Sequence, residues 1–119
     1  TSPLKRAWQT AESISDTCGC TLATDKRLSE VDLGDLQGRS EPELDFSKLW
    51  VEGRLPYNVE SFADVRERVK AAILDAVEQS DGIPAIIAHS GVFFALCHWL
   101  NRPHLFREIP HAKAVTITL

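Results

Sequence analysis

Three residues of the sequence are of types that can bind and transform a phosphate group: Arg6, Glu30 and His89. The guanidinium of Arg6 can hold two phosphate oxygens at once. His89 directly follows the apolar run PAIIA and precedes a predicted helix, whose N-terminus favours an anion. Glu30 follows a predicted strand and could supply a carboxylic acid. Because ligands of open α/β sheets bind outside the carboxyl ends of the strands, these residues are candidates for one site.

Each candidate also has a plain structural interpretation. A surface arginine is usually solvated or paired with an acid, and a polar residue that ends a buried strand often only satisfies backbone groups. Ser90 would suit a serine hydrolase, but HSGVF lacks the glycine that precedes the serine in the nucleophile-elbow motif. For three further histidines we expect structural roles only: His98, His104 and His111.

Composition restricts the class of protein. The chain has 119 residues, which predicts a single domain over 1–119, and a formal net charge of −4, which argues against a nucleic-acid partner. No uninterrupted apolar run reaches the ~18 residues of a membrane span, so we expect no membrane partner. Three cysteines cannot form a complete disulfide set, and Cys18-Gly19-Cys20 lacks the spacing of a metal pair. We therefore expect free thiols, a cytoplasmic location and no metal site.

The elements that must position these residues follow from hydrophobic spacing. A helix is predicted from Ser2-Pro3 to Gly19, with Ser2 as its cap, and another around residues 41–50. Ser61 caps a third predicted helix, and a fourth follows His89-Ser90-Gly91 through Leu100. The expected buried face of the third helix is Phe62, Val65, Val69, Ala72, Ile73, Ala76 and Val77.

Three segments are predicted to be strands: one within TLATDKRL, the run PAIIA over residues 84–88, and the C-terminal AVTITL. PAIIA is apolar without alternation, as expected of a parallel strand buried on both faces. Alternating helices and strands predict an α/β fold, namely a three-layer arrangement with a mostly parallel sheet and helices on both faces, incomplete at the N-terminus.

Four stretches together resemble one family. TSPLKRAWQTAESI, LSEVDLGDLQG, VESFADVRERV and IIAHSGVFFAL are similar, in this order, to the motifs of the histidine phosphatase superfamily, which includes phosphoglycerate mutase-like enzymes. The resemblance covers residues 1–100 and implies the phosphoglycerate mutase-like fold. Two stretches of this sequence, GDLQG and YNVES, depart from the patterns that are common in the family. These departures argue against a strict glycolytic mutase, and the short insert over residues 31–59 favours a small, general phosphatase.

The resemblance also implies a mechanism and residue roles. In the family, a histidine of an Arg-His-Gly motif attacks phosphorus and becomes a phosphohistidine, from which water or a second hydroxyl takes the phosphoryl group; no metal or other cofactor is needed. By position, Arg6 binds the phosphate, His89 is the second histidine of the phosphate pocket, and Glu30 protonates the leaving oxygen. Ser90 and Gly91 shape the pocket through backbone N–H groups.

The sequence contains no Arg-His-Gly and no Met. We therefore expect a fragment that lacks the first strand or strands and the nucleophile, and that is inactive alone. Its expected partners are a small phosphorylated substrate and either its own N-terminal piece or a second copy. The alternative is a non-catalytic phosphate-binding or interaction module, a pseudophosphatase. Retention of Arg6, Glu30 and His89 together favours an enzyme as the parent protein, because a binding module needs no proton donor.

Overall fold

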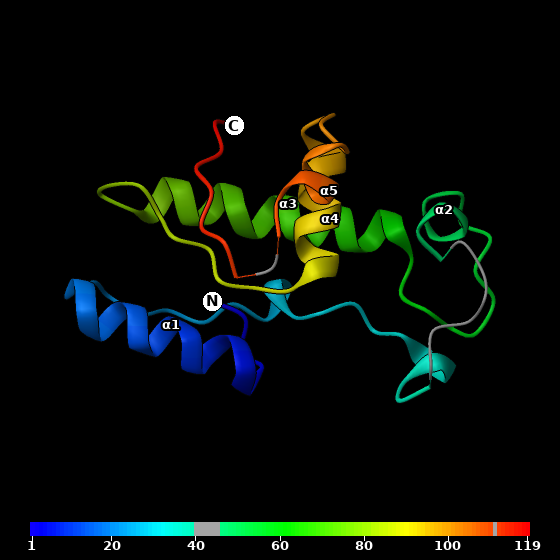
Figure 1. Cartoon of the computed structure of the whole chain (residues 1–119), viewed down its shortest axis with the longest axis horizontal. Helices are drawn as coiled ribbons and strands as arrows, with labels where there is room; N and C mark the ends of the chain where they lie inside the picture. The colour runs from blue at the N-terminus through cyan, green and yellow to red at the C-terminus, as the bar shows by residue number, and fades with distance from the viewer. Residues whose placement is uncertain (40–45, 111) are drawn as a thin grey trace.

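A computed structural model describes residues 1–39, 46–110 and 112–119 of the chain. Its described elements are helices and short 3₁₀ turns joined by extended segments (Figure 1). The α-helices are α1 (Lys5–Cys18), α2 (Phe46–Val51), α3 (Phe62–Gln79), α4 (Ser90–Trp99) and α5 (Leu105–Glu108). The 3₁₀ turns are η1 (Lys26–Leu28) and η2 (Gly34–Leu36). Helix α4 packs across the middle of α3, and η1 also packs on α3, whereas α1 lies apart from both (Figure 1).

Helix α1 confirms the first predicted helix and its end. Gly19 takes the left-handed conformation with φ of 65°, and its N–H donates to the Ser15 carbonyl at 2.8 Å, which closes the helix. The start lies later than the sequence predicts, because the N-cap is Leu4. The Ser2 hydroxyl instead accepts from the Leu4 N–H at 3.2 Å, within the turn that precedes the helix.

Helix α3 confirms the predicted cap. The Ser61 hydroxyl accepts from the Asp64 N–H at 3.1 Å and donates to the Asp64 carboxylate at 2.6 Å. The predicted apolar face is buried over its first part, at Phe62, Val65, Val69, Ala72 and Ile73. The prediction of a buried side chain is wrong at Val77, which is 45% exposed. Helix α4 covers the middle of α3 but not its C-terminal turns (Figure 1).

The core lies between α3 and α4, and α2 and the segment after η1 pack against it. Trp50 of α2 is 4% exposed, and its indole N–H donates to the Glu60 carbonyl at 2.8 Å. Its ring meets the Phe62 ring edge-on at 5.1 Å and stacks on the Phe94 ring at 5.8 Å. The core residues are Leu28, Val31, Trp50, Phe62, Val65, Val69, Ala72, Ile73, Val92 and Ala95.

The expected three-layer α/β fold with a mostly parallel sheet is wrong, because the described residues contain no strand. The TLATDKRL segment ends in η1, where the Asp25 carboxylate accepts from the Arg27 N–H. Residues 83–89 do run extended, but among the described residues their one backbone bond to a segment distant in sequence is that from the Ser2 N–H to the Ile87 carbonyl. A sheet needs ladders of such bonds along several neighbouring strands, and one contact does not make a ladder.

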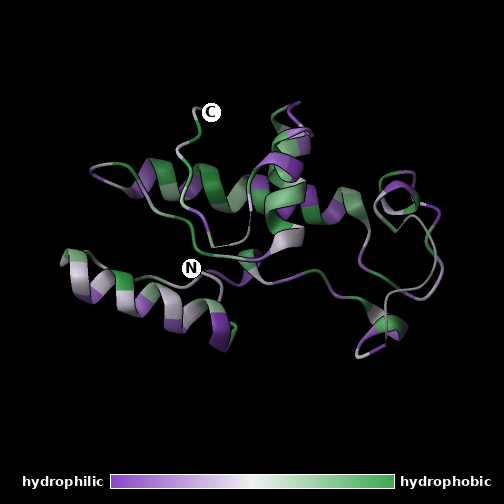
Figure 2. Ribbon diagram, viewed as in Figure 1, coloured by the Kyte–Doolittle hydropathy of each residue, from purple (hydrophilic) through white to green (hydrophobic). Residues whose placement is uncertain are grey.

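The segments that we predicted to be strands are apolar, but they are not buried as the prediction requires. Figure 2 shows the run before α4 as a hydrophobic stretch. Ile86 within it is nevertheless 37% exposed, and Ile83 just before it is 91% exposed. The C-terminal AVTITL is also extended and mostly exposed. Of the helix predicted around residues 41–50, residues 41–45 lie outside the described residues, and the remainder falls in α2.

None of the described helices combines the length and apolar character that crossing a membrane requires.

The two valines of α3 provide a test of this packing. Val69→Ala should lower the free energy of unfolding by about 1–3 kcal/mol, because it removes fully buried methyl groups and leaves a cavity. Val77→Ala, the matched control at an exposed site, should leave it unchanged or raise it slightly, since alanine is the better helix former. Urea unfolding followed by circular dichroism measures both. Equal losses for the two variants would contradict the arrangement of α3 and α4.

Candidate functional site

The carboxylate of Glu30 lies against the N-terminus of α4. Its Oε1 atom accepts from the Gly91 N–H at 3.1 Å and from the Val31 N–H at 3.0 Å. The Ser90 hydroxyl donates to Oε2 at 3.4 Å. The structure therefore brings together three of the five predicted site residues, Glu30, Ser90 and Gly91. The Gly91 N–H, which we expected to face a phosphate, donates to the protein's own carboxylate.

Gly91 permits this contact because it has no side chain. A Cβ atom at this position would lie 2.5 Å from Glu30 Oε1 and 2.5 Å from Val31 Cγ2. Real Cβ atoms do not approach other heavy atoms so closely, and Val31 is itself buried. The glycine is thus required by the close approach of Glu30 to the helix backbone.

His89 is the residue that precedes α4, and its backbone is extended. The half-buried ring places Nε2 2.8 Å from the hydroxyl oxygen of Ser2. Burial lowers the pKa of His89 below its ordinary value; the Glu30 carboxylate opposes this shift, and the Arg6 and Arg68 guanidinium groups add to it. His89 is therefore neutral at pH 7, so one ring nitrogen carries a proton and the other accepts.

Arg6 reaches the same region from α1. Its side chain is exposed, and within the described part of the chain its guanidinium makes no hydrogen bond or ion pair. It nevertheless lies close enough to His89 to lower the pKa of that ring. A guanidinium without an internal partner, beside a neutral imidazole, remains available to bind an anion from solution.

Arg68 and Glu60 hold the segment that carries Glu30, and sequence reasoning did not assign them. The Arg68 guanidinium donates to the carbonyl oxygens of Arg27 at 2.6 Å and Ser29 at 2.8 Å. It also binds both carboxylate oxygens of Glu60, at 2.7 and 2.9 Å. Both side chains are largely buried. The stretch VESFADVRERV contains both residues, but its spacing alone does not reveal that the arginine binds a loop carbonyl.

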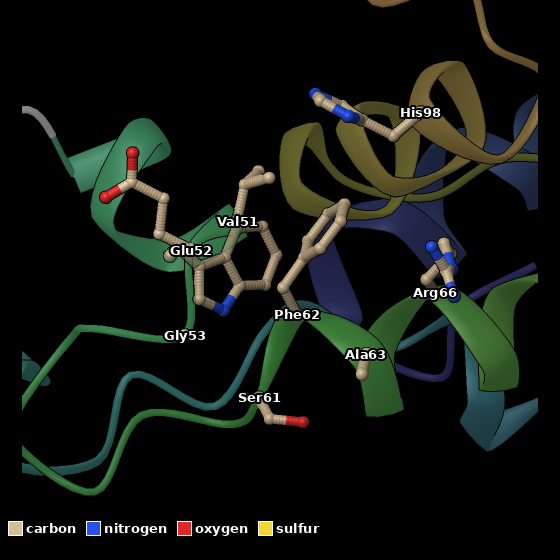
Figure 3. A pocket seen from close by; sticks show the side chains of 9 residues that line it. Val51, Glu52, Gly53, Ser61, Phe62, Ala63, Arg66 and His98 are labelled. Atoms are coloured by element: carbon tan, nitrogen blue, oxygen red, sulfur yellow. The ribbon is translucent and has the colours of Figure 1, made fainter.

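Two cavities adjoin these elements. One, of about 540 Å³, opens beside Glu30 and is lined by Lys26, Ser29, Glu30, Asp32, Asn58, Glu60 and Arg68. The other, of about 380 Å³, lies between α2, the start of α3 and the C-terminal part of α4 (Figure 3). Its lining includes Phe62, Arg66 and His98 but none of the predicted site residues. The first cavity is lined by one of them, Glu30, so we place the candidate site at the N-terminus of α4, beside this cavity.

The remaining predicted residues fit structural roles where they are described. The His98 ring contacts the rings of Phe94 and Phe62, at 4.5 and 5.2 Å. His104 precedes α5, and His111 lies outside the described residues. Within the described ranges, no group of three or more His, Cys, Asp and Glu side chains is arranged to hold a metal ion.

Comparison with known proteins identifies a family. The profile of the Histidine phosphatase superfamily (branch 1) matches residues 1–119. Probable phosphoglycerate mutase GpmB of Klebsiella pneumoniae is 36% identical over 99 residues, which cover 75% of this chain and 46% of the relative. The protein of the same name from an Enterobacter species is 36% identical over 98 residues, covering 74% and 45%. The chain spans about half the length of these curated relatives. No solved structure matches it significantly.

Gly91→Ala should disrupt the site, because the new methyl group would displace the Glu30 carboxylate or Val31. We expect a loss of about 1–3 kcal/mol in the free energy of unfolding, as for other overpacked sites. Gly82→Ala is the matched control: its added Cβ meets no atom within 4 Å, and it should change stability little. Urea unfolding of both variants measures the difference, and a Gly91→Ala protein as stable as the control would contradict the contact.

Proposed function

The chain belongs to the histidine phosphatase superfamily, and on this premise we propose that its site binds the phosphoryl group of a small phosphomonoester. Arg6 and His89 hold the phosphoryl oxygens, while Ser90 and Gly91 shape the pocket at the start of α4. The observation that carries the proposal is the grouping of Glu30, Ser90 and Gly91 with His89 at the N-terminus of one helix. Nearby lies Arg6, whose guanidinium has no partner in the part of the chain that the structure describes.

Glu30 is proposed as the acid that protonates the leaving oxygen. Both backbone donors to its carboxyl group, the N–H groups of Val31 and Gly91, bind Oε1. Oε2 is met by the Ser90 hydroxyl at the longer distance of 3.4 Å, so it is the oxygen that can carry a proton and give it up. A carboxyl group held by one oxygen keeps the other aimed in a fixed direction, which general acid catalysis requires.

For the whole protein we propose phosphoryl transfer through a phosphohistidine. A histidine nitrogen attacks phosphorus and forms an N–P bond as the P–O bond to the leaving group breaks, and the leaving oxygen takes the proton of Glu30. Water or a second hydroxyl then attacks phosphorus and gives its proton to the Glu30 carboxylate as the N–P bond breaks. The 119 residues contain no Arg-His-Gly, so we propose that they bind phosphate analogues without forming the phosphohistidine themselves.

The second candidate is a phosphate-binding module without catalysis. Arg6 and His89 would serve binding alone, whereas the presence of Glu30 near His89 favours the enzyme, because binding needs no proton donor. Incubation of the full-length protein with a ³²P-labelled phosphomonoester separates them. Acid-labile label on a histidine identifies the enzyme, and its absence identifies the module.

Location and partners are further proposals. Cys18, Cys20 and Cys97 are free thiols, which supports a reducing compartment, the cytoplasm. Ile83 and Ile86 expose apolar surface on the extended segment before α4. We propose that another polypeptide covers this segment, either a further part of the same protein or a second copy of the chain.

Arg6→Ala should weaken orthovanadate binding about 10- to 100-fold, since a hydrogen bond between charged groups is worth about 1.5–3 kcal/mol. Lys5→Ala is the matched control, because it removes a neighbouring positive charge from the same exposed turn of α1. It should change the affinity less than about threefold, as expected of screened surface charge. Isothermal titration at constant ionic strength gives both dissociation constants. Unchanged affinity in Arg6→Ala would remove Arg6 from the site.

A further inference from the structure

The hydroxyl of Ser2 lies buried beside the candidate site, in contact with His89. Ser2 is 0% exposed, the one fully buried polar residue among the described residues. The Ser2 N–H donates to the Ile87 carbonyl at 3.0 Å, and the Thr1 hydroxyl donates to the same carbonyl at 2.9 Å. These bonds hold the first two residues against the segment that ends in His89. Ser2 therefore has a role beyond the helix cap that its position in the sequence suggests.

The bonds of this hydroxyl determine the direction of its hydrogen. Its oxygen accepts from the Leu4 N–H at 3.2 Å, and its other partner is Nε2 of His89 at 2.8 Å. A hydroxyl has one hydrogen to donate, and burial removes water as an acceptor. The Leu4 N–H cannot accept a hydrogen bond, so among the described residues Nε2 of His89 is the one partner of this hydroxyl that can. Nε2 is thus the acceptor that satisfies the hydroxyl hydrogen, and an acceptor nitrogen carries no proton.

We propose that Ser2 is a positioning residue, which donates its hydroxyl hydrogen to Nε2 of His89 and thereby keeps the proton of the neutral ring on Nδ1. The Nδ1–H then serves as a fixed donor toward an anion beside Arg6. This last use rests on the function proposed above, whereas the choice of tautomer does not.

Burial of the His89 ring favours the same neutral state; Arg6 and Arg68 add to this effect, and Glu30 opposes it. Glu30 from the segment after η1, Arg6 from α1 and Arg68 from α3 are the charged groups that act on the ring. Together with burial, they leave the pKa of His89 below its ordinary value, so the ring is neutral at pH 7. A protonated ring would present an N–H at Nε2 and leave the buried Ser2 hydrogen without an acceptor, which costs free energy. In the neutral tautomer with its proton on Nδ1, Nε2 accepts the Ser2 hydrogen, so the hydroxyl and Nε2 are both hydrogen-bonded.

The test is the ¹⁵N spectrum of the histidine rings in the 119-residue protein at pH 7.5 without any anion. His89→Gln identifies the signals of His89 by their loss. We expect Nε2 to have the chemical shift of an unprotonated ring nitrogen and Nδ1 that of an N–H. A protonated Nε2, or shifts averaged between the two tautomers, would overturn the proposal. This measurement needs no variant at position 2 and no ligand, so it is decided separately from the function.

Ser2→Ala provides the second arm, with Ser13→Ala as its control. Ser13 is an exposed serine of α1 whose hydroxyl donates to the Gln9 carbonyl. Ser2→Ala should move the His89 signals toward the other tautomer and weaken orthovanadate binding about two- to fivefold, because the competent state loses population. Ser13→Ala should change neither. An Nδ1–H tautomer that persists in folded Ser2→Ala protein would show that Ser2 does not control it. Wild-type protein that shows the tautomer but does not bind orthovanadate would contradict only the proposed function.

Discussion

The approach of the Glu30 carboxylate to the backbone of Gly91 is the contact on which the site depends. It joins a loop to the first turn of α4, and it forms only because position 91 has no Cβ atom. The loop is fixed in turn by Arg68, which binds the carbonyl oxygens of Arg27 and Ser29 and is itself held by Glu60. Displacement of any of these groups moves the carboxylate away from the helix.

The same contact explains the electrostatics of the region. The N–H groups at the N-terminus of α4 favour an acceptor, and the protein supplies one with the Oε1 atom of its own Glu30 side chain. Two guanidinium groups, those of Arg6 and Arg68, lie near a histidine that stays neutral. Arg68 donates its hydrogen bonds to Glu60 and to backbone carbonyl oxygens. Arg6, in contrast, is exposed and has no hydrogen-bond partner for its guanidinium among the described residues. The arrangement therefore separates an arginine that builds the site from one that is free to bind a ligand.

The helices could be predicted from the sequence because their signals are local. Ser61 with Asp64 marks the start of α3, and Gly19 marks the end of α1. The strands could not, because a strand depends on partners that local pattern does not specify. PAIIA has the composition of a buried strand, yet its described neighbour is one short segment at Thr1 and Ser2. The predicted burial of Val77 is wrong for a similar reason, since an apolar residue on a helix face is buried only where another element packs on it.

The residue types of the candidate site could be predicted from the sequence, but the hydrogen bonds that support them could not. Motif resemblance indicated Glu30, His89, Ser90 and Gly91, which the structure brings to one helix end, and Arg6, which lies near it. The supporting groups Ser2, Glu60 and Arg68 act through bonds between segments distant in sequence. Ser2 also has an ordinary local explanation, as a residue that precedes a helix. A single sequence contains no signal that distinguishes these two roles.

A crystal structure of the protein grown with tungstate tests the central claim most directly, because anomalous scattering locates the anion. The account predicts one ordered tungstate with oxygens about 3 Å from the Arg6 guanidinium and from Nδ1 of His89, and with the Glu30 carboxyl still bound to the Gly91 N–H. Tungstate found only elsewhere, for example between Arg66 and His98, would contradict the account, as would an anion that displaces Glu30 from the helix.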